Sequence, residues 1–354
     1  MIETIDIKIN KTPVSRIQSV DFNKLSFGNV FSDHMFVADY ADGEWKNFQI
    51  IPYGDMAFSP AMASLHYGQS IFEGMKAFRQ KDDQIAVFRP LKNLERLNIS
   101  AERLCMPTIP EEIFMQGLTK LIDLDRQWAP TGEGQSLYIR PLMFATDNIL
   151  GVHPSDSYKF IIMTGPVGAY YSKNLKVKIE LHYSRADEGG VGYAKTAGNY
   201  ARSLYPTHLA NKEGYDQLIW TDSKTHSYIE EAGTANVMFV INNVLITPST
   251  RDTILNGITR HTILDLANAW GMETQERRVS VEEVVEAAKA GHLQEAFAAG
   301  TAATISHMAE IGYKDELYTL PDPQERVFSN KALKALSNIR YGLVPDQFGW
   351  NHLV

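Results

Sequence analysis

Apolar residues follow two different rhythms along the first half of the chain, one typical of strands and one typical of helices. Continuous apolar runs rich in β-branched and aromatic residues predict strands at residues 85–89, 136–145 and 158–164. Residues 91–104 and 111–127 instead repeat their apolar positions every three or four places, which predicts two amphipathic helices. We therefore expect a mixed α and β structure in this half.

Turn and cap residues mark the ends of several elements. Asp42–Gly43 stands between two apolar stretches and predicts a hairpin, because both residues accept the backbone conformation of a tight turn. Thr108 is followed three places on by Glu111, and Ser280 by Glu283. This spacing predicts a capping box at the start of each of two helices.

The composition of the sequence changes at residues 165–174, which are rich in Gly, Pro and Tyr. We place a domain boundary there, with a small α/β domain over residues 1–172 and a large α+β domain over residues 173–354. A length of 354 residues also exceeds the usual size of one domain. Strands of the second part are expected at residues 176–181, 217–221, 236–241 and 244–248, and helices after Thr259, from Ser280 and near residues 330–340.

Composition excludes several classes of function. A formal net charge of −8 argues against nucleic-acid binding, which needs clustered Lys and Arg. No apolar stretch approaches the roughly 20 residues of a membrane span, and the histidines show no metal-ligand spacing. The single cysteine, Cys105, permits no disulfide within the chain, so we expect a cytoplasmic protein and a packed, inert thiol.

Lys195 lies in the stretch GGVGYAKTAGNY, residues 189–200, where small residues surround it and no acid is adjacent. A charged amine needs water or a partner to remain charged at low cost. Either Lys195 is a solvated loop lysine, or its amine forms an imine with a carbonyl ligand, for which the small neighbours leave room.

Three further segments suit a phosphorylated aromatic ligand. Glu230 and Glu231 precede an apolar strand, where a carboxylate is either solvated or able to reach a buried cation such as a protonated ring nitrogen. Gly257 and Thr259 open an amphipathic helix, whose N-terminal N–H groups attract a phosphate. Residues 298–306 form a second loop of small and hydroxyl-bearing residues that could bind an anion.

The combination is more specific than its parts. A lysine able to form an imine, an acid for a ring nitrogen and Gly/Thr loops for a phosphate are the requirements of pyridoxal 5'-phosphate. Arg96 could add a guanidinium to the phosphate.

Specific motifs along nearly the whole chain then become recognisable. The sequence resembles the branched-chain amino acid aminotransferases of pyridoxal-phosphate fold type IV, from about residue 27 to residue 350. The motifs that carry the resemblance are LHYGQSIFEGMKAFR (65–79), FRPLKNLERL (88–97), SLYIRPLMFA (136–145), GPVGAY (165–170), YAKTAGNY (193–200), EEAGTANVMF (230–239), LNGITRHTILDLA (255–267) and GTAATI (300–305).

The resemblance implies a role for each cofactor-binding residue. Lys195 is similar to the lysine that holds pyridoxal 5'-phosphate as an aldimine and moves the proton between Cα and C4′ of the adduct. Glu231 matches the acid that pairs with the pyridine nitrogen, and Tyr200 the tyrosine that hydrogen-bonds the phenolic oxygen. The implied phosphate contacts are Arg96, Ile258 through its backbone N–H, Thr259 and Thr301.

The resemblance also implies a substrate pocket and a homodimer. Aromatic walls for a branched aliphatic side chain correspond to Phe27, Tyr67, Phe72, Tyr138 and Tyr170. Leu150 and Val152 match residues that the family contributes from the partner subunit. The implied donors for the substrate α-carboxylate are Thr234 and Ala302, and Arg140 has the means to accept the distal carboxylate of glutamate.

The implied activity is reversible transamination of L-leucine, L-isoleucine and L-valine with 2-oxoglutarate. D-amino-acid transaminases and aminodeoxychorismate lyases of the same fold use the same lysine, acid and phosphate loops, and they remain alternatives. A ligand-binding or assembly protein that kept the fold without turnover is a third, although Lys195 and Glu231 are both present.

Overall fold

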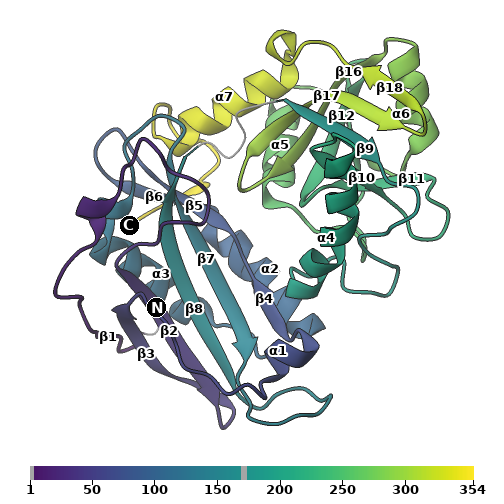
Figure 1. Ribbon diagram of the computed structural model, residues 1–354. Coiled ribbons are helices and arrows are strands. Elements are labelled where there is room, and N and C mark those ends of the chain that lie inside the picture. The colour runs from purple at the N-terminus through teal and green to yellow at the C-terminus, as the bar shows by residue number, and fades with distance from the viewer. Residues whose placement is uncertain (1–3, 169–173) are drawn as a thin grey trace. The chain divides into compact units, whose positions relative to one another are not determined.

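The computed structural model describes residues 4–168 and 174–354 of the chain (Figure 1). These residues form two compact units. The first unit contains residues 4–168, 194–197 and 337–354, and the second contains residues 174–193 and 198–336. The predicted boundary between residues 172 and 173 lies outside the described residues and stays a prediction.

The first unit is built on one mixed sheet. Among the described residues its strands follow the order β1-β3-β2-β8-β7-β5-β6-β19, and β4 pairs with β7. The strands are β1 (Lys8–Ile9), β2 (His34–Ala41), β3 (Glu44–Pro52), β4 (Ser70–Phe72), β5 (Met75–Arg79), β6 (Ile85–Phe88), β7 (Ser136–Ala145), β8 (Tyr158–Val167) and β19 (Asn351–Leu353).

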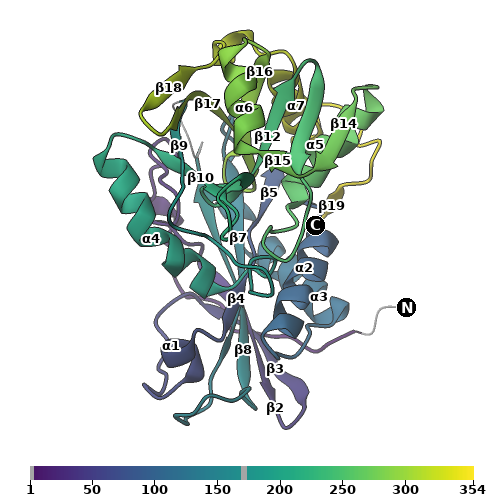
Figure 2. The same ribbon diagram turned by 90° about the vertical axis from the view of Figure 1, so that its right-hand side faces the viewer.

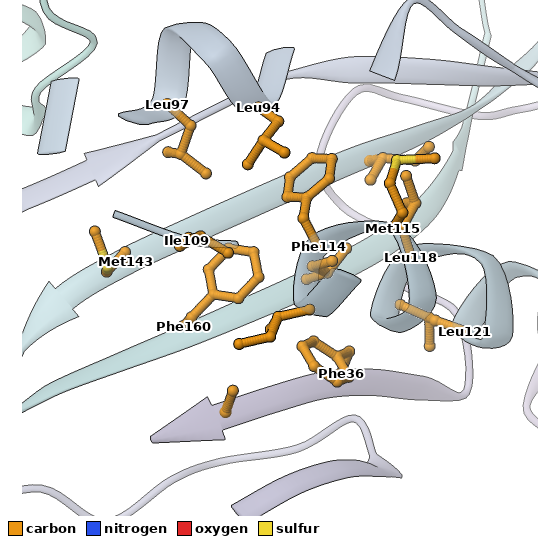
Figure 3. Close-up of a cluster of buried hydrophobic side chains, with 14 of the residues drawn as sticks. Phe36, Leu94, Leu97, Ile109, Phe114, Met115, Leu118, Leu121, Met143 and Phe160 are labelled. Carbon is orange, nitrogen blue, oxygen red and sulfur yellow. The ribbon is translucent and has the colours of Figure 1, made fainter. Parts of the chain in front are cut away.

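Helices α2 (Pro90–Arg103) and α3 (Glu111–Leu124) pack against each other and cover one face of this sheet (Figure 2). Phe114 of α3 lies between the helices and the strands, close to Phe36 and Phe160, and all three rings are fully buried (Figure 3). The predicted apolar face of α3 is therefore confirmed. A shorter helix, α1 (Ala63–Tyr67), precedes β4.

The second unit contains a closed ring of strands. Its order is β14-β13-β12-β16-β17-β9-β10-β11-β15, and β11 pairs with β12 as well, so that β12, β16, β17, β9, β10 and β11 close on themselves. Closure leaves these strands no free edge and encloses an apolar core. The strands are β9 (Leu175–Ile179), β10 (Gln217–Thr221), β11 (Tyr228–Ala232), β12 (Ala235–Ile241), β13 (Val244–Pro248), β14 (Thr274–Arg277), β15 (Val279–Ser280), β16 (Leu293–Gly300), β17 (Thr304–Tyr313) and β18 (Glu316–Thr319).

Four longer helices accompany the strands of the second part of the chain. They are α4 (Ala197–Lys212), α5 (Ile258–Ala269), α6 (Val281–Lys289) and α7 (Phe328–Arg340). The short 3₁₀ helices of the described chain are Ile17–Ser19, Arg126–Trp128 and Pro323–Glu325. No helix of the described residues is long and apolar enough to cross a membrane.

Most local predictions hold, and two need correction. The Asp42–Gly43 turn joins β2 to β3 with positive φ at both residues, and the Ser280 hydroxyl accepts the Glu283 N–H at the start of α6. The cap predicted at Thr108 is wrong: α3 starts after Pro110, whose fixed φ suits a helix start.

The second correction concerns Cys105, which is exposed rather than packed because it lies past the end of α2 with positive φ. Two short segments from far along the chain, residues 194–197 and 337–354, belong to the first unit, where β19 pairs with β6. β19 has only three residues, too few to show a strand pattern in sequence.

Candidate active site

Backbone contacts within the first unit fix the position of Lys195. The Lys195 N–H donates to Ser100 Oγ at 2.9 Å, and its carbonyl accepts the Phe72 N–H at 3.1 Å. Thr196 pairs with Ile71, so this short segment continues the edge of β4. Ser100 lies on α2 and donates its hydroxyl hydrogen to the Arg96 carbonyl, which ties the lysine to the helix. The solvated-loop interpretation of Lys195 does not fit this half-buried, anchored backbone.

An aromatic cluster surrounds the Lys195 amine. Lys195 Nζ lies 5.0 Å from the centroid of the Phe72 ring, and the Arg140 guanidinium lies 4.6 Å from the same centroid. Arg140 Nη2 donates to the Tyr138 hydroxyl at 2.8 Å, and the Tyr138 ring meets Phe27 edge-on at 4.8 Å. Five residues predicted from sequence are thus brought together in one place.

Arg140 retains a donor in this cluster. Its Nε is buried and has no hydrogen-bond partner among the described residues. A buried guanidinium donor left unpaired is costly unless a ligand oxygen takes it. The arrangement can therefore accept a carboxylate.

Four other predicted pocket residues lie away from this cluster or outside the described residues. Tyr67 ends α1 with 46% of its side chain exposed. Leu150 and Val152 lie between β7 and β8, exposed by 64% and 88%. Tyr170 lies outside the described residues.

Arg96 makes a buried bidentate ion pair that sequence did not reveal. Its Nε and Nη2 atoms donate to the two carboxylate oxygens of Glu73 at 2.7 and 2.8 Å. This bidentate pairing fixes the orientation of the Arg96 guanidinium. Its role toward a phosphate stays a prediction.

Glu231 is the best-supported acid of the second unit. It is 2% exposed, and its Oε1 accepts the Leu255 N–H at 2.8 Å and the Asn236 amide at 3.1 Å. Its Oε2 lies 2.9 Å from Arg185 Nε. A guanidinium and these donors favour the charged carboxylate.

Glu230 lies in a different environment, although it is adjacent in sequence. Its Oε1 accepts the Thr253 hydroxyl at 2.7 Å, and its Oε2 is buried with no hydrogen-bond partner among the described residues. Burial raises the pKa of Glu230 to about 7, although the hydrogen bond from Thr253 opposes it; the charge of Glu231 adds to the rise, and that of Arg185 reduces it.

The N-terminus of α5 lies against the network of Glu231. Asn236 donates to the Leu255 carbonyl as well as to Glu231, and a Cβ on Gly257 would come within 1.7 Å of Asn236 Oδ1. Gly257 is the N-cap of α5, and no side chain of the described residues caps this end. The first N–H groups of the helix, at Ile258 and Thr259, thus suit an anion.

Two turns complete the described part of the site in the second unit. Gly233 turns the chain from β11 to β12 with φ of +56°, which leaves Thr234 exposed. Tyr200 and Thr234 line one small hollow together with Arg185, Asn199, Ser203, Gly233 and Leu255. Thr301 and Ala302 form the turn between β16 and β17, next to the Ala299–Asn236 pair of the sheet.

Sequence reasoning missed four residues that hold the site. Glu73, Ser100, Arg185 and Asn236 contact Arg96, Lys195 or Glu231. Asn236 could have been found, because it stands in the same short motif as Glu231. The others are separated from their partners by at least 23 residues, so only the fold identifies them.

The chain is an aminotransferase of class IV. The family model described as amino-transferase class IV matches residues 70–311, and the chain belongs to this family. The predicted fold class and family are confirmed, and the protein is an enzyme that acts on amino and oxo acids.

Individual relatives place the chain within the family. It is 44% identical to branched-chain-amino-acid aminotransferase 2 of Bacillus subtilis over 98% of this chain and 96% of the relative. It is 46% identical to a probable branched-chain-amino-acid aminotransferase of Staphylococcus aureus over 94% of each chain. The crystal structure of the branched-chain amino acid aminotransferase of Escherichia coli superposes with a TM-score of 0.73 at 27% identity, covering 90% of this chain and 98% of that one.

Proposed function

We propose that this enzyme transfers the amino group of L-leucine, L-isoleucine or L-valine reversibly to 2-oxoglutarate. The products would be branched-chain 2-oxo acids and L-glutamate. The observation that carries this proposal is the identity of 44–46% with relatives named for branched-chain amino acids, over at least 94% of the chain. The aromatic cluster beside Lys195 supports it, because Phe27, Phe72 and Tyr138 offer apolar surface to an aliphatic side chain.

Pyridoxal 5'-phosphate is the cofactor that the donor set fits best. Lys195 supplies an amine, Glu231 a buried carboxylate, and α5 a helix N-terminus without a side-chain cap. Thr259, Thr301, Tyr200 and Arg96 are proposed as further contacts to it. When bound, this cofactor supplies the electron sink that stabilises negative charge at the substrate Cα.

The chain's own groups would perform the remaining tasks. The Lys195 amine takes the proton from the substrate Cα and returns it, as a general base and acid. Arg140 donates its buried Nε–H to the distal carboxylate of glutamate. The Phe72 and Tyr138 rings hold the guanidinium in place. Thr234 and Ala302 are proposed donors for the α-carboxylate.

A homodimer is proposed from the exposure of an apolar loop. Ile149, Leu150 and Val152 lie in one loop and are exposed by 55%, 64% and 88%. Clustered apolar side chains at a surface are typical of contact sites. We propose that Leu150 and Val152 reach the substrate pocket of a second copy of the chain.

The test is the visible absorption of the purified protein supplied with pyridoxal 5'-phosphate, followed on addition of amino acids. We expect a cofactor band that bleaches with L-leucine, returns with 2-oxoglutarate and ignores D-alanine. A band that responds to D-alanine instead would favour the D-amino-acid transaminase. A stable band indifferent to both would favour the lyase, and no band at all would contradict the cofactor.

A further inference from the structure

Glu230 and Glu231 are consecutive residues of β11, so their side chains project to opposite sides of the strand. Both are more than nine-tenths buried. Two adjacent buried carboxylates repel each other, and burial of each charge is costly unless it is paired. In the structure, Glu231 has more hydrogen-bond and ionic partners than Glu230.

Glu231 has the pairing that stabilises a charge. It accepts from the Leu255 N–H, the Asn236 amide and the Arg185 guanidinium. Glu230 accepts the Thr253 hydroxyl on Oε1, while its buried Oε2 has no hydrogen-bond partner among the described residues. An ionised Glu230 would leave charge on that unsolvated oxygen, whereas a proton on Oε2 removes the charge.

The charge of Arg185 favours an ionised Glu230, whereas the charges of Glu231 and Asp222 oppose it. Asp222 lines the same small cavity, and backbone N–H donors lower its pKa, so its negative charge faces Glu230. Arg278 stacks on the Tyr228 ring, 4.3 Å from its centroid, and Arg185 is engaged by Glu231. The titratable and charged groups around Glu230 are Arg185, Glu188, Asp222, Tyr228, Glu231, Arg251 and Arg278.

A short chain of contacts couples the two acids. Thr253 donates its hydroxyl hydrogen to Glu230, and its carbonyl accepts from Arg185 Nη1 at 2.9 Å. The same guanidinium lies 2.9 Å from Glu231 through its Nε. A change in the charge of Glu230 therefore acts on Glu231 both directly and through the Thr253–Arg185 contact.

We propose that Glu230 is a positioning residue which is protonated on Oε2 at weakly acidic pH, so that the acid pair then carries one negative charge and Glu231 holds it. Glu230 acts through Glu231 and touches neither cofactor nor substrate. The part of the proposal that concerns catalysis rests on the proposed function, in which Glu231 faces the cofactor ring. The protonation itself is a property of the folded chain.

The proton on Glu230 would titrate in the physiological range, because its pKa is raised to about 7. Above that pH a second negative charge appears beside Glu231. In the proposed function Glu231 faces the ring nitrogen of the cofactor, and this added charge would favour the protonated form of that nitrogen. The two acids would therefore make the electrostatics of the site depend on pH.

The protonation is tested on the folded protein by infrared difference spectroscopy, with Glu230→Gln as the reference. We expect a protonated-carboxyl band at pH 6 that disappears by pH 8 in the wild type and is absent at both pH values in E230Q. A wild type without the band at pH 6, or a band that survives in E230Q, overturns the proposal. Thr253→Val retains Glu230 and should move the loss of the band to higher pH, which keeps the test available if E230Q does not fold.

Stability gives a second readout that requires no turnover. The pKa of Glu230 is raised in the folded state above its ordinary value of 4.5, so the folded state binds this proton more tightly than the unfolded state. The stability gained from that proton is complete below about pH 4.5 and is lost as the pH rises to about 7. The urea midpoint of E230Q should therefore rise relative to the wild type across this range, and a constant difference contradicts the raised pKa.

The positioning role is tested on the holoenzyme by the pH dependence of the bound cofactor's absorption and of kcat/KM. Wild type should show a step near the pH at which the carboxyl band disappears, and E230Q should lose that step. Superimposable profiles with a titrating carboxyl band overturn the positioning role. A wild type that shows the carboxyl band but does not respond to L-leucine contradicts the proposed function instead, so the two failures are distinguishable.

Discussion

Individual side chains in this enzyme take their roles from contacts that lie outside their own sequence motifs. Lys195 is held by Ser100 on α2 and by the backbone of Phe72 on β4. Glu230 and Glu231 are chemically identical neighbours, yet Arg185 and Asn236 single out one of them as the charged acid. Substitution of one of these side chains should therefore change the activity and leave the fold intact.

Lys195→Ala should keep the fold and remove the amine that moves the Cα proton. The backbone contacts of Lys195 do not involve its side chain, so little stability depends on the amine. Loss of a general base lowers turnover by about 10²–10⁴-fold. Steady-state kinetics with L-leucine check this, with circular dichroism as the control for folding. Wild-type turnover in the variant would remove Lys195 from the mechanism.

Glu231→Gln should cost far more activity than Glu230→Gln. The first substitution leaves the Arg185 guanidinium and the cofactor nitrogen without a counter-charge, whereas the second replaces a neutral acid by a neutral amide of the same shape. Comparison of kcat/KM for the two variants at pH 6 decides the order. The reverse order would assign the ring nitrogen to Glu230.

Elements bring together residues that lie far apart in the chain. In the second unit, β11 supplies Glu231, β12 supplies Asn236, and the start of α5 brings Gly257 against Asn236. The helix end has no side-chain cap among the described residues, unlike α6, where Ser280 caps the first turn. Within the described residues, the absence of a side-chain cap at the N-terminus of α5 agrees with the binding of an anion there.

Gly257→Ala should weaken cofactor binding and stability together. The new Cβ would lie 1.7 Å from Asn236 Oδ1, so Asn236 must move and release Glu231 and Leu255. Overpacking of this kind costs about 1–3 kcal/mol. Urea unfolding and cofactor titration measure the two effects. Gly54→Ala is the matched control, because its Cβ would meet nothing within 4 Å, and equal losses in both variants would contradict the steric reason.

Ser280→Ala should lower the free energy of unfolding without changing the site. The Ser280 hydroxyl accepts the Glu283 N–H at 3.0 Å at the start of α6. Loss of an N-cap costs about 1 kcal/mol. Chemical denaturation measures this, and an unchanged KM for L-leucine is the accompanying expectation. Ser280→Thr, which keeps the cap, should restore most of the loss.

At the scale of the whole molecule, some apolar side chains lie exposed on the surface of a single copy of the chain. Leu150 and Val152 are exposed by 64% and 88% in a loop between two long strands of the first sheet. In a class-IV aminotransferase whose pocket is built on that same sheet, such a loop suits contact with a second copy. Assembly and activity should then depend on each other.

Replacement of Leu150 and Val152 by Asp should weaken a dimer and raise KM for L-leucine. Charges placed in an apolar contact are unfavourable because they lose their water without gaining a partner. Sedimentation at several protein concentrations measures the assembly, and kinetics measure the pocket. Leu204→Asp on α4, exposed by 69%, is the control for added surface charge. A dimer unaffected by the double substitution would place this loop outside the interface.

The sequence by itself determined the family and most local structure. Apolar periodicity predicted α3 and β7, and the Asp42–Gly43 and Ser280 signals predicted a turn and a cap that the structure confirms, because these features depend on neighbours within a few residues. The Thr108 cap failed because Pro110 fixes the helix start. Motifs around Lys195 and Glu231 carried the family resemblance.

The tertiary structure alone decided how the predicted residues are held. β19 joins the first sheet, and the strands of the second unit close into a ring, because pairing between distant segments leaves no periodic trace in either segment. The partners Glu73, Ser100 and Arg185 are likewise invisible in sequence, since each contact joins residues that only folding brings close. The unequal burial and pairing of Glu230 and Glu231 follow from these long-range contacts, and they set which acid carries the charge.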